Sequence, residues 1–221
     1  MDTFKKIIFA VVLCMGSIIC SAQEISIRGG LNLSEFRVKY EGEVLHGGNA
    51  KLNPGFNAGA TLDVPIKSLF SLETGILLNS KGNKISSGDE LGANKELQRE
   101  NLLYLDAPVL CKITVPIKKI RIFAMAGPYL GYALSGKQKA EVTINSVHNE
   151  WEANIPWGDR YDRFDYGAKT GIGLRYKKYQ IGASYEFGFK EIYKASELAR
   201  KNRVLELYVS YALINLKSDK N

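Results

Sequence analysis

The side chains best suited to acid–base or metal chemistry in this sequence are its two histidines, His46 and His148. Neither lies at metal-ligand spacing from another histidine or a cysteine, so we expect no metal site. Ser146, Asp159 and Asp162 lie close to the second histidine and could supply a nucleophile and an orienting acid. Because this spacing constrains the geometry little, a solvated polar loop is the favoured interpretation. We therefore expect neither a catalytic residue nor a cofactor.

The N-terminal stretch has the pattern of a secretory signal. Two lysines precede an apolar run at residues 7–20, and small residues lead up to Gln23. We expect residues 1–22 to be cleaved and residues 23–221 to form a single domain. In that domain Cys111 has no cysteine partner, and no segment reaches the roughly 20 consecutive apolar residues that a membrane helix needs. If the exported chain enters a membrane, it must do so as a closed barrel.

Residues 164–189 alternate apolar and polar side chains on either side of Lys177-Lys178. Side chains alternate across a strand, so this stretch predicts a hairpin with one apolar and one polar face. If the two lysines form a two-residue turn, the pairing places Lys169 directly opposite Glu186 on the polar face. The turn lacks the glycine or asparagine that hairpins prefer, which makes this register less secure.

The same alternation predicts six further strands, at residues 24–34, 55–66, 70–79, 102–115, 121–134 and 204–213. The strand at 121–134 alternates poorly and is predicted mainly from its apolar length. Pro108 interrupts its strand, so we expect a bulge or kink there. With the hairpin, eight strands are expected.

The connections between these strands alternate in length. Short links at 67–68, 116–119 and 177–178 alternate with long ones at 35–54, 80–101, 136–163 and 190–203. Brief turns at one end and long loops at the other are typical of bacterial outer-membrane barrels. The sequence therefore predicts an all-β fold, an eight-stranded antiparallel up-and-down transmembrane β-barrel. A soluble ligand-binding barrel, with its apolar face inward, is the alternative.

Aromatic residues near the strand ends favour an outward, lipid-facing apolar surface. A mid-strand lysine or arginine turned to lipid would cost about 2 to 4 kcal/mol, so the charges must face inward. We expect inward glycines to leave room for a lumen charge network that plugs the barrel. Its predicted members are Arg28, Asp63, Glu73, Asp106, Lys112, Lys169, Arg175, Glu186 and Glu206.

Two surface features suggest partners. A basic rim at the short-turn end can meet anionic lipid head groups, and it consists of Lys67, Lys118, Lys119, Lys177, Lys178, Lys217 and Lys220. Trp151 and Trp157 lie in the longest loop, where they could contact a partner or cover the barrel mouth. The net charge of +7 is also compatible with nucleic-acid binding. The sequence contains no recognisable nucleic-acid-binding module, so no nucleic-acid partner is expected.

Several short motifs carry a resemblance to a known family. They are Gly30-Leu31-Asn32-Leu33-Ser34, Pro54-Gly55-Phe56-Asn57-Ala58-Gly59, Leu72-Glu73-Thr74-Gly75-Ile76, Tyr104-Leu105-Asp106-Ala107-Pro108-Val109-Leu110 and Gly127-Pro128-Tyr129-Leu130-Gly131. Together they resemble the PorT-like outer-membrane β-barrel domain of Bacteroidetes-type bacteria, over nearly the whole mature chain. The resemblance implies the bacterial outer membrane, and it supplies no catalytic motif. The family's founding member is associated with a secretion apparatus.

These observations favour a non-enzymatic, monomeric integral membrane barrel whose external loops bind a partner or scaffold an envelope or secretion assembly. Its expected partners are outer-membrane lipid and envelope proteins. Alternatives that stay open are a lipid- or peptide-modifying enzyme at the barrel mouth, a soluble ligand-binding barrel and a narrow pore.

Overall fold

The computed structural model of the chain describes residues 24–40, 43–44, 50–88, 94–144, 147–158, 160–195 and 198–215. The predicted signal segment, His46, Ser146, Asp159, Lys217 and Lys220 lie outside these residues. Within the described ranges, no helix is long and apolar enough to cross a bilayer.

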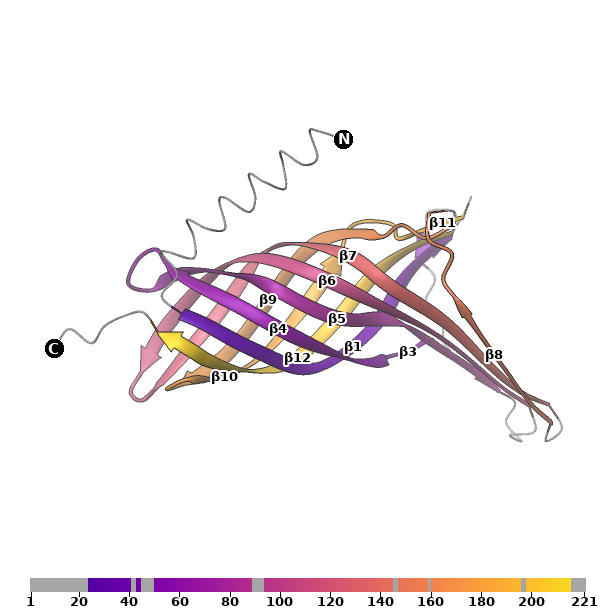
Figure 1. The fold of residues 1–221 in the computed structure, drawn as a ribbon, viewed down its shortest axis with the longest axis horizontal. Coiled ribbons are helices and arrows are strands. Elements are labelled where there is room, and N and C mark those ends of the chain that lie inside the picture. The colour runs from indigo at the N-terminus through magenta and orange to yellow at the C-terminus, as the bar shows by residue number, and fades with distance from the viewer. Residues whose placement is uncertain are drawn as a thin grey trace.

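Eight strands form a closed antiparallel ring, as predicted (Figure 1). In ring order they are β1 (Glu24–Tyr40), β4 (Asn53–Pro65), β5 (Phe70–Gly88), β6 (Asn94–Ile117), β7 (Ile120–Ile144), β9 (Phe164–Tyr176), β10 (Tyr179–Gly188) and β12 (Leu198–Asn215). The ring closes where β12 pairs with β1. Four shorter strands are added to it: β2 (Glu43–Val44), β3 (Ala50–Lys51), β8 (Val147–Asn154) and β11 (Tyr193–Ala195).

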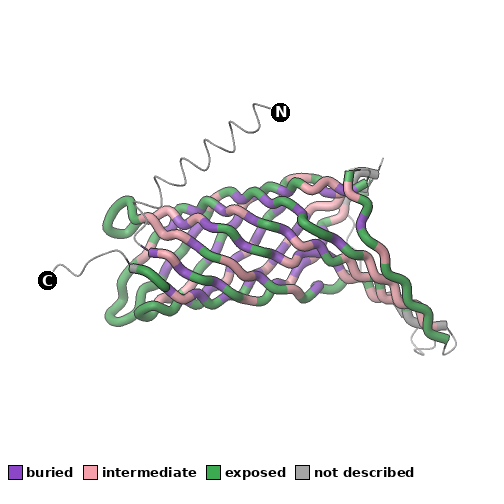
Figure 2. The backbone as a smooth tube through the Cα atoms, viewed as in Figure 1, coloured by how far each residue is buried: buried purple, intermediate pink, exposed green. Residues whose placement is uncertain are grey.

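Buried and exposed residues alternate along the strands of the ring (Figure 2). The exposed residues of this alternation are largely apolar, and the buried ones include the charged side chains. Ile172 and Ile181 are 66% and 64% exposed, whereas Lys169 and Glu186 are 1% and 0% exposed. A soluble barrel with an apolar ligand cavity would show the reverse. This arrangement confirms the predicted facing of the strands.

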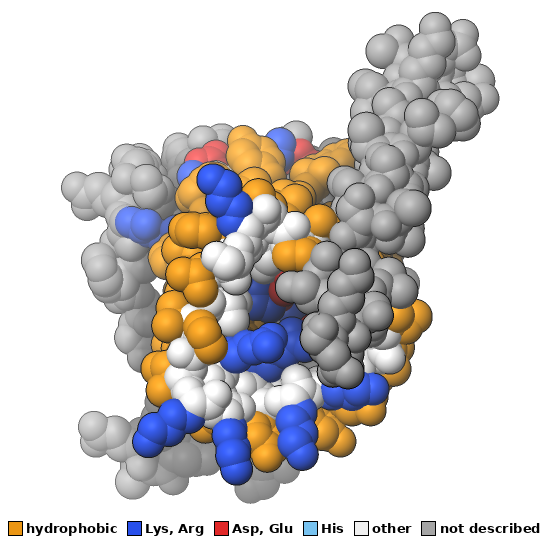
Figure 3. Space-filling view, turned by 90° about the vertical axis from the view of Figure 1, so that its left-hand side faces the viewer, with side chains coloured by type: hydrophobic (Ala, Val, Ile, Leu, Met, Phe, Trp, Pro, Cys, Tyr) orange, Lys and Arg blue, Asp and Glu red, His pale blue; other side chains and the backbone are white. Residues whose placement is uncertain are grey.

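The short connections lie at one end of the ring, which we call the turn end. Lys118-Lys119 joins β6 to β7, Lys177-Lys178 joins β9 to β10, and residues 66–69 join β4 to β5. These lysines and Lys67 are exposed, and lysine and arginine side chains surround the opening at this end (Figure 3). The two-residue turn also confirms the predicted register, because Lys169 pairs with Glu186.

Two predicted irregularities have a different origin in the structure. The poor alternation at 121–134 arises because β7 also carries apolar residues inward, including Phe123, Met125 and Tyr129. The ladder is interrupted at Pro108, as predicted, but without a bulge. Pairing of β5 with β6 lapses there, but the register is the same on both sides, and Thr74 Oγ1 donates a hydrogen bond to the Pro108 carbonyl (2.8 Å). The bulge between β6 and β7 lies instead at Leu103/Tyr104.

The predicted long connections at 80–101 and 136–163 are largely strand, which corrects the sequence interpretation. β5, β6 and β7 continue past the ring, and β8 adds to β7 (Figure 1). We call residues 83–88, 94–100, 137–144 and 147–154 the sheet extension. Cross-strand ion pairs support it, with Lys137 Nζ 2.6 Å from Glu152 Oε1 and Lys139 Nζ 2.7 Å from Glu150 Oε1. Because both faces are largely polar here, no apolar alternation marks these strands.

Candidate functional site

The lumen near the turn end holds a linked set of charges, the turn-end cluster. Arg28 Nη2 lies 2.6 Å from Glu73 Oε1. Lys112 Nζ donates to Glu73 Oε2 (2.9 Å), to Asp63 Oδ2 (2.9 Å) and to Gln180 Oε1 (3.1 Å). These residues come from β1, β4, β5, β6 and β10, so the cluster ties together strands around the ring.

A third cation, Arg175, bridges the ring closer to the turns. Arg175 on β9 donates through both terminal nitrogens to the Glu24 carboxylate on β1. β9 and β1 are not neighbours in the ring, so this fork spans the interior. Arg175 was a predicted lumen residue, whereas Glu24 was missed. Its inward parity with Ser26 and Arg28 is the signal that could have identified it.

A central cluster of charges fills the lumen beyond these contacts. Lys169 Nζ lies 3.0 Å from Glu186 Oε1 and 2.6 Å from Glu206 Oε2. Ser184 Oγ donates to the same Glu206 oxygen at 2.9 Å. All three charged side chains are fully buried. Burial of unpaired charges would be strongly unfavourable, so these contacts make the position of each side chain specific.

Lys81 is the member of the central cluster that sequence reasoning missed. Its Nζ lies 2.8 Å from Glu186 Oε2, 2.9 Å from Asp106 Oδ2 and 3.6 Å from Asp165 Oδ2. The ammonium also lies over the Tyr129 ring, 4.6 Å from its centroid. Lys81 was assigned to a loop because the predicted strand ended at residue 79. Lys81 continues the alternation of the inward residues of β5, and this continuation is the sequence signal that could have identified it.

Neutral donors complete the central cluster, which holds four carboxylates and two lysines. Tyr129 OH donates to Asp165 Oδ2 at 3.0 Å, and Asn202 Nδ2 donates to the same oxygen at 2.8 Å. Asn79 Nδ2 donates to Asp106. The carboxylates of Asp106 and Asp165 therefore accept hydrogen bonds from neutral side chains of β5, β7 and β12. Such bonds lower the cost of burying more carboxylates than lysines.

Aromatic rings occupy much of the space that the inward glycines leave. The Arg28 guanidinium lies 4.0 Å from the Tyr208 ring centroid, and Lys112 Nζ lies 4.6 Å from that of Phe123. A Cβ at Gly182 would approach Tyr208 Cζ to 2.5 Å, and one at Gly173 would approach Phe123 Cζ to 2.3 Å. The glycines thus make room for rings that pack against the cations, and not only for charged chains as expected.

The end opposite the turns holds a cluster of buried apolar residues, which we call the mouth cluster. It consists of Phe36, Leu102, Tyr104, Ala133, Ile155, Tyr161 and Ile192. Three of them come from the connecting segments 155–163 and 189–192, which fold over the opening. Tyr161 OH also donates to Glu100 Oε2 (3.1 Å). Burial, together with Glu100, raises the pKa of Tyr161 above its ordinary value, so its hydroxyl keeps the proton at neutral pH.

The two tryptophans have different surroundings. Trp157 packs against the mouth cluster, with its ring centroid 6.2 Å from that of Tyr161 and 4.9 Å from the Arg163 guanidinium. Trp151 lies on β8 in the sheet extension and is 56% exposed. Trp157 therefore packs at the mouth end, whereas Trp151 is exposed on the sheet extension.

Of the residues considered for catalysis, the structure describes His148 and Asp162, and these two have different partners. His148 Nδ1 lies 3.2 Å from Thr143 Oγ1 in the β7–β8 hairpin. Asp162 Oδ2 instead lies 3.1 Å from Lys190 Nζ, beside the mouth. Within the described ranges, no group of three or more histidine, cysteine or acidic side chains could hold a metal ion.

Comparisons with known proteins found similar solved structures and a matching family model. Similar solved structures are OprG from Pseudomonas aeruginosa (12% identity, 88% of this chain and 97% of that one, TM-score 0.46), Neisserial surface protein A (10%, 85% and 96%, TM-score 0.41) and Ail of Yersinia pestis (17%, 86% and 98%, TM-score 0.38). No curated protein sequence matches significantly. The family model described as "Outer membrane protein beta-barrel domain" matches residues 21–194. The chain therefore belongs to this family of bacterial outer-membrane β-barrels.

Proposed function

We propose that this protein is a sealed, non-enzymatic membrane anchor that presents its sheet extension to another component of the cell envelope. The observation that carries the proposal is the filling of the lumen. The turn-end cluster, the central cluster and the mouth cluster follow one another along the barrel, and their cations contact carboxylates from several strands. An eight-stranded barrel has an interior just wide enough for side chains. An anchor fits this interior better than a pore does.

The sheet extension is the part best placed to bind a partner. It projects from the mouth end, which is external if the short turns are periplasmic (Figure 1). Among the residues that the structure describes, β8 pairs only with β7, which leaves its other edge available to a further strand. Trp151 lies on this strand, and exposed tryptophans are common anchors at interfaces. The resemblance to PorT-like domains supports a partner from an envelope or secretion assembly.

Conductance across planar bilayers tests the sealed lumen. The purified full-length barrel is expected to give no discrete channel openings at moderate voltage. Replacing the mouth residue Tyr161 by Ala should also leave the bilayer closed, because the central cluster remains in place. Steady conductance of the unmodified protein would contradict the proposal.

Site-specific photo-crosslinking in cells tests the binding surface. A photoreactive residue at position 151 should yield a discrete crosslinked product. Pro156, which is exposed beside the mouth, gives a matched control position, and crosslinks there should be weaker or absent. The same products at both positions, or none at position 151, would argue against the sheet extension as the binding surface.

The enzyme alternative has a separate test. His148→Ala should leave the lipid A structure and envelope peptide processing unchanged, because the histidine lies with Thr143 and not with Asp162. Loss of a lipid or peptide modification in this variant would favour a catalytic role.

A further inference from the structure

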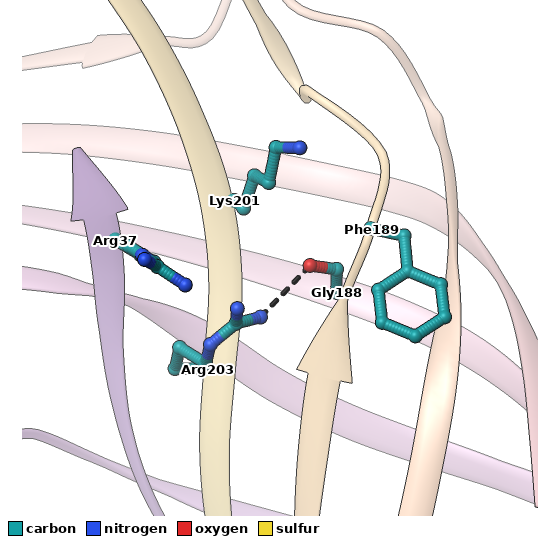
Figure 4. A pocket seen from close by; sticks show the side chains of 5 residues that line it. All are labelled: Arg37, Gly188, Phe189, Lys201 and Arg203. Atoms are coloured by element: carbon teal, nitrogen blue, oxygen red, sulfur yellow. Dashed lines mark hydrogen bonds between the residues drawn. The ribbon is translucent and has the colours of Figure 1, made fainter. Parts of the chain in front are cut away.

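A basic pocket of about 260 Å³ lies on the outer wall of the barrel (Figure 4). Arg37 of β1, Lys201 and Arg203 of β12, and Gly188 and Phe189 at the end of β10 line it. No residue of the predicted lumen network takes part. The pocket is therefore separate from the central and turn-end clusters.

The position of the pocket follows from the alternation of the strands. Arg37 continues the outward series of Leu31 on β1, and Arg203 continues that of Leu207 on β12. Both leucines are exposed on the apolar outer wall. Phe187 and Phe189 are exposed at the same level on β10 and just after it. The pocket thus lies where the apolar wall meets the polar mouth end, the level at which aromatic girdles mark a membrane interface.

Three cations line this pocket. Arg37 and Lys201 pair directly across β1 and β12. The Arg203 guanidinium is held in place, because its Nη1 donates to the Gly188 carbonyl at 2.8 Å. The Arg37 guanidinium extends toward that of Arg203 (Figure 4). Within the described ranges, Arg37 makes no hydrogen bond or ion pair of its own. Such an arrangement favours an anion between the two guanidinium groups.

Nearby acids do not neutralise the three cations. Glu191 Oε1 lies 3.6 Å from Lys201 Nζ, a long contact. Glu35 pairs with Arg203 in the β1–β12 register but forms no ion pair with it among the described residues. Lys190, which follows Phe189, is engaged by Asp162 at 3.1 Å. With these acids counted, the pocket keeps a positive excess.

We propose that this pocket binds a phosphate group on the head group of an outer-leaflet lipid. Guanidinium groups match phosphate oxygens in charge and geometry. The apolar wall that continues from Leu31 and Leu207 toward the turn end would contact the acyl chains of the same molecule. The combination of cations and apolar wall fits a phosphorylated lipid better than a free anion, because a free anion has no acyl chains to contact the wall.

The test measures lipid binding to the delipidated full-length barrel in detergent by native mass spectrometry. The probes are phosphorylated lipid A and a dephosphorylated form with the same acyl chains. The double variant Arg37→Gln/Lys201→Gln should bind phosphorylated lipid A at least about tenfold more weakly. The matched control, Lys51→Gln/Lys84→Gln, removes two lysines that also lie directly opposite each other on neighbouring strands, β3 and β5, and should bind like the unmodified protein. Arg203 is not substituted because its guanidinium also donates a hydrogen bond to the Gly188 carbonyl.

Folding and the source of the phosphate need separate checks. The heat-dependent gel shift reports whether each variant forms the barrel, and the single variant Arg37→Gln serves if the double variant does not. Equal binding of both lipid A forms to the unmodified protein, or equal binding by variant and control, would overturn the proposal. Displacement of lipid A by millimolar inorganic phosphate would assign the pocket to a free anion and overturn its assignment to a lipid.

Discussion

Strands β5, β6 and β7 run through both the ring and the sheet extension, yet their side chains follow different rules in the two regions. In the ring, outward residues such as Leu78 and Leu105 are apolar and inward residues such as Asn79 and Asp106 are polar. In the extension, Lys84 and Lys139 continue the outward series. The strand backbone is continuous, so the change in side chains records the change from lipid to water. The membrane boundary can thus be located along a single strand.

The largest expected difference between the two regions concerns a buried and a partly exposed lysine on β5, Lys81 and Lys84. Lys81→Met should destabilise the barrel by about 3–5 kcal/mol, because it leaves the carboxylates of Asp106, Asp165 and Glu186 without their shared cation. Lys84→Met, in the sheet extension, should change stability by less than about 0.5 kcal/mol. Urea unfolding in lipid vesicles measures both. Equal losses of stability in the two variants would mean that Lys81 is not buried among these carboxylates.

Outward residues of similar exposure provide the second comparison. Ile172 on β9 is 66% exposed and Val147 on β8 is 61% exposed. Ile172→Lys should cost about 2 to 4 kcal/mol because its surroundings are lipid. Val147→Lys should cost almost nothing because its surroundings are water. Vesicle refolding yields and urea midpoints report the difference, and a harmless Ile172→Lys would place β9 outside the bilayer.

Acid should loosen the sheet extension before the ring. Hydrogen bonding to Lys139 lowers the pKa of Glu141, and hydrogen bonding to Lys137 lowers that of Glu152. These carboxylates favour the folded extension above their ordinary pKa of 4.5, and the contribution is lost as pH falls through their lower folded values. Hydrogen exchange of β8 amides should therefore lose more protection than that of β10 amides on acidification, once the intrinsic exchange rates are corrected. High salt at neutral pH should weaken β8 protection in the same direction.

The smallest expected effect concerns the turn end. Lys177 adopts φ 53°, in the left-handed region that asparagine tolerates better than lysine. Lys177→Asn should stabilise the barrel by about 0.5 kcal/mol. Lys178, whose φ is not positive, is the control position. An equal gain for Lys178→Asn would show that charge removal, and not backbone conformation, is responsible.

The sequence was informative where one face of a strand meets lipid and the other meets the lumen. Strict alternation placed Lys169 opposite Glu186 and oriented Arg28, Glu73, Lys112 and Glu206 inward. It failed for Lys81 and the sheet extension, because strands that are polar on both faces cannot be told from loops by periodicity. It was also weak for β7, whose inward Phe123 and Tyr129 pack against cations. Such rings become predictable only when the residues across the lumen are known.

The ring is completed by a pairing of β1 with β12 that runs from Glu24↔Asn215 to Tyr40↔Leu198. Strand β1 therefore pairs with β4 on one side and, on the other, with β12, which is the last strand of the ring in the sequence. Until β12 is in place, β1 presents an open row of backbone donors and acceptors that hydrocarbon cannot satisfy. Stable insertion should thus await the whole chain, with sealing of this seam as the committing event.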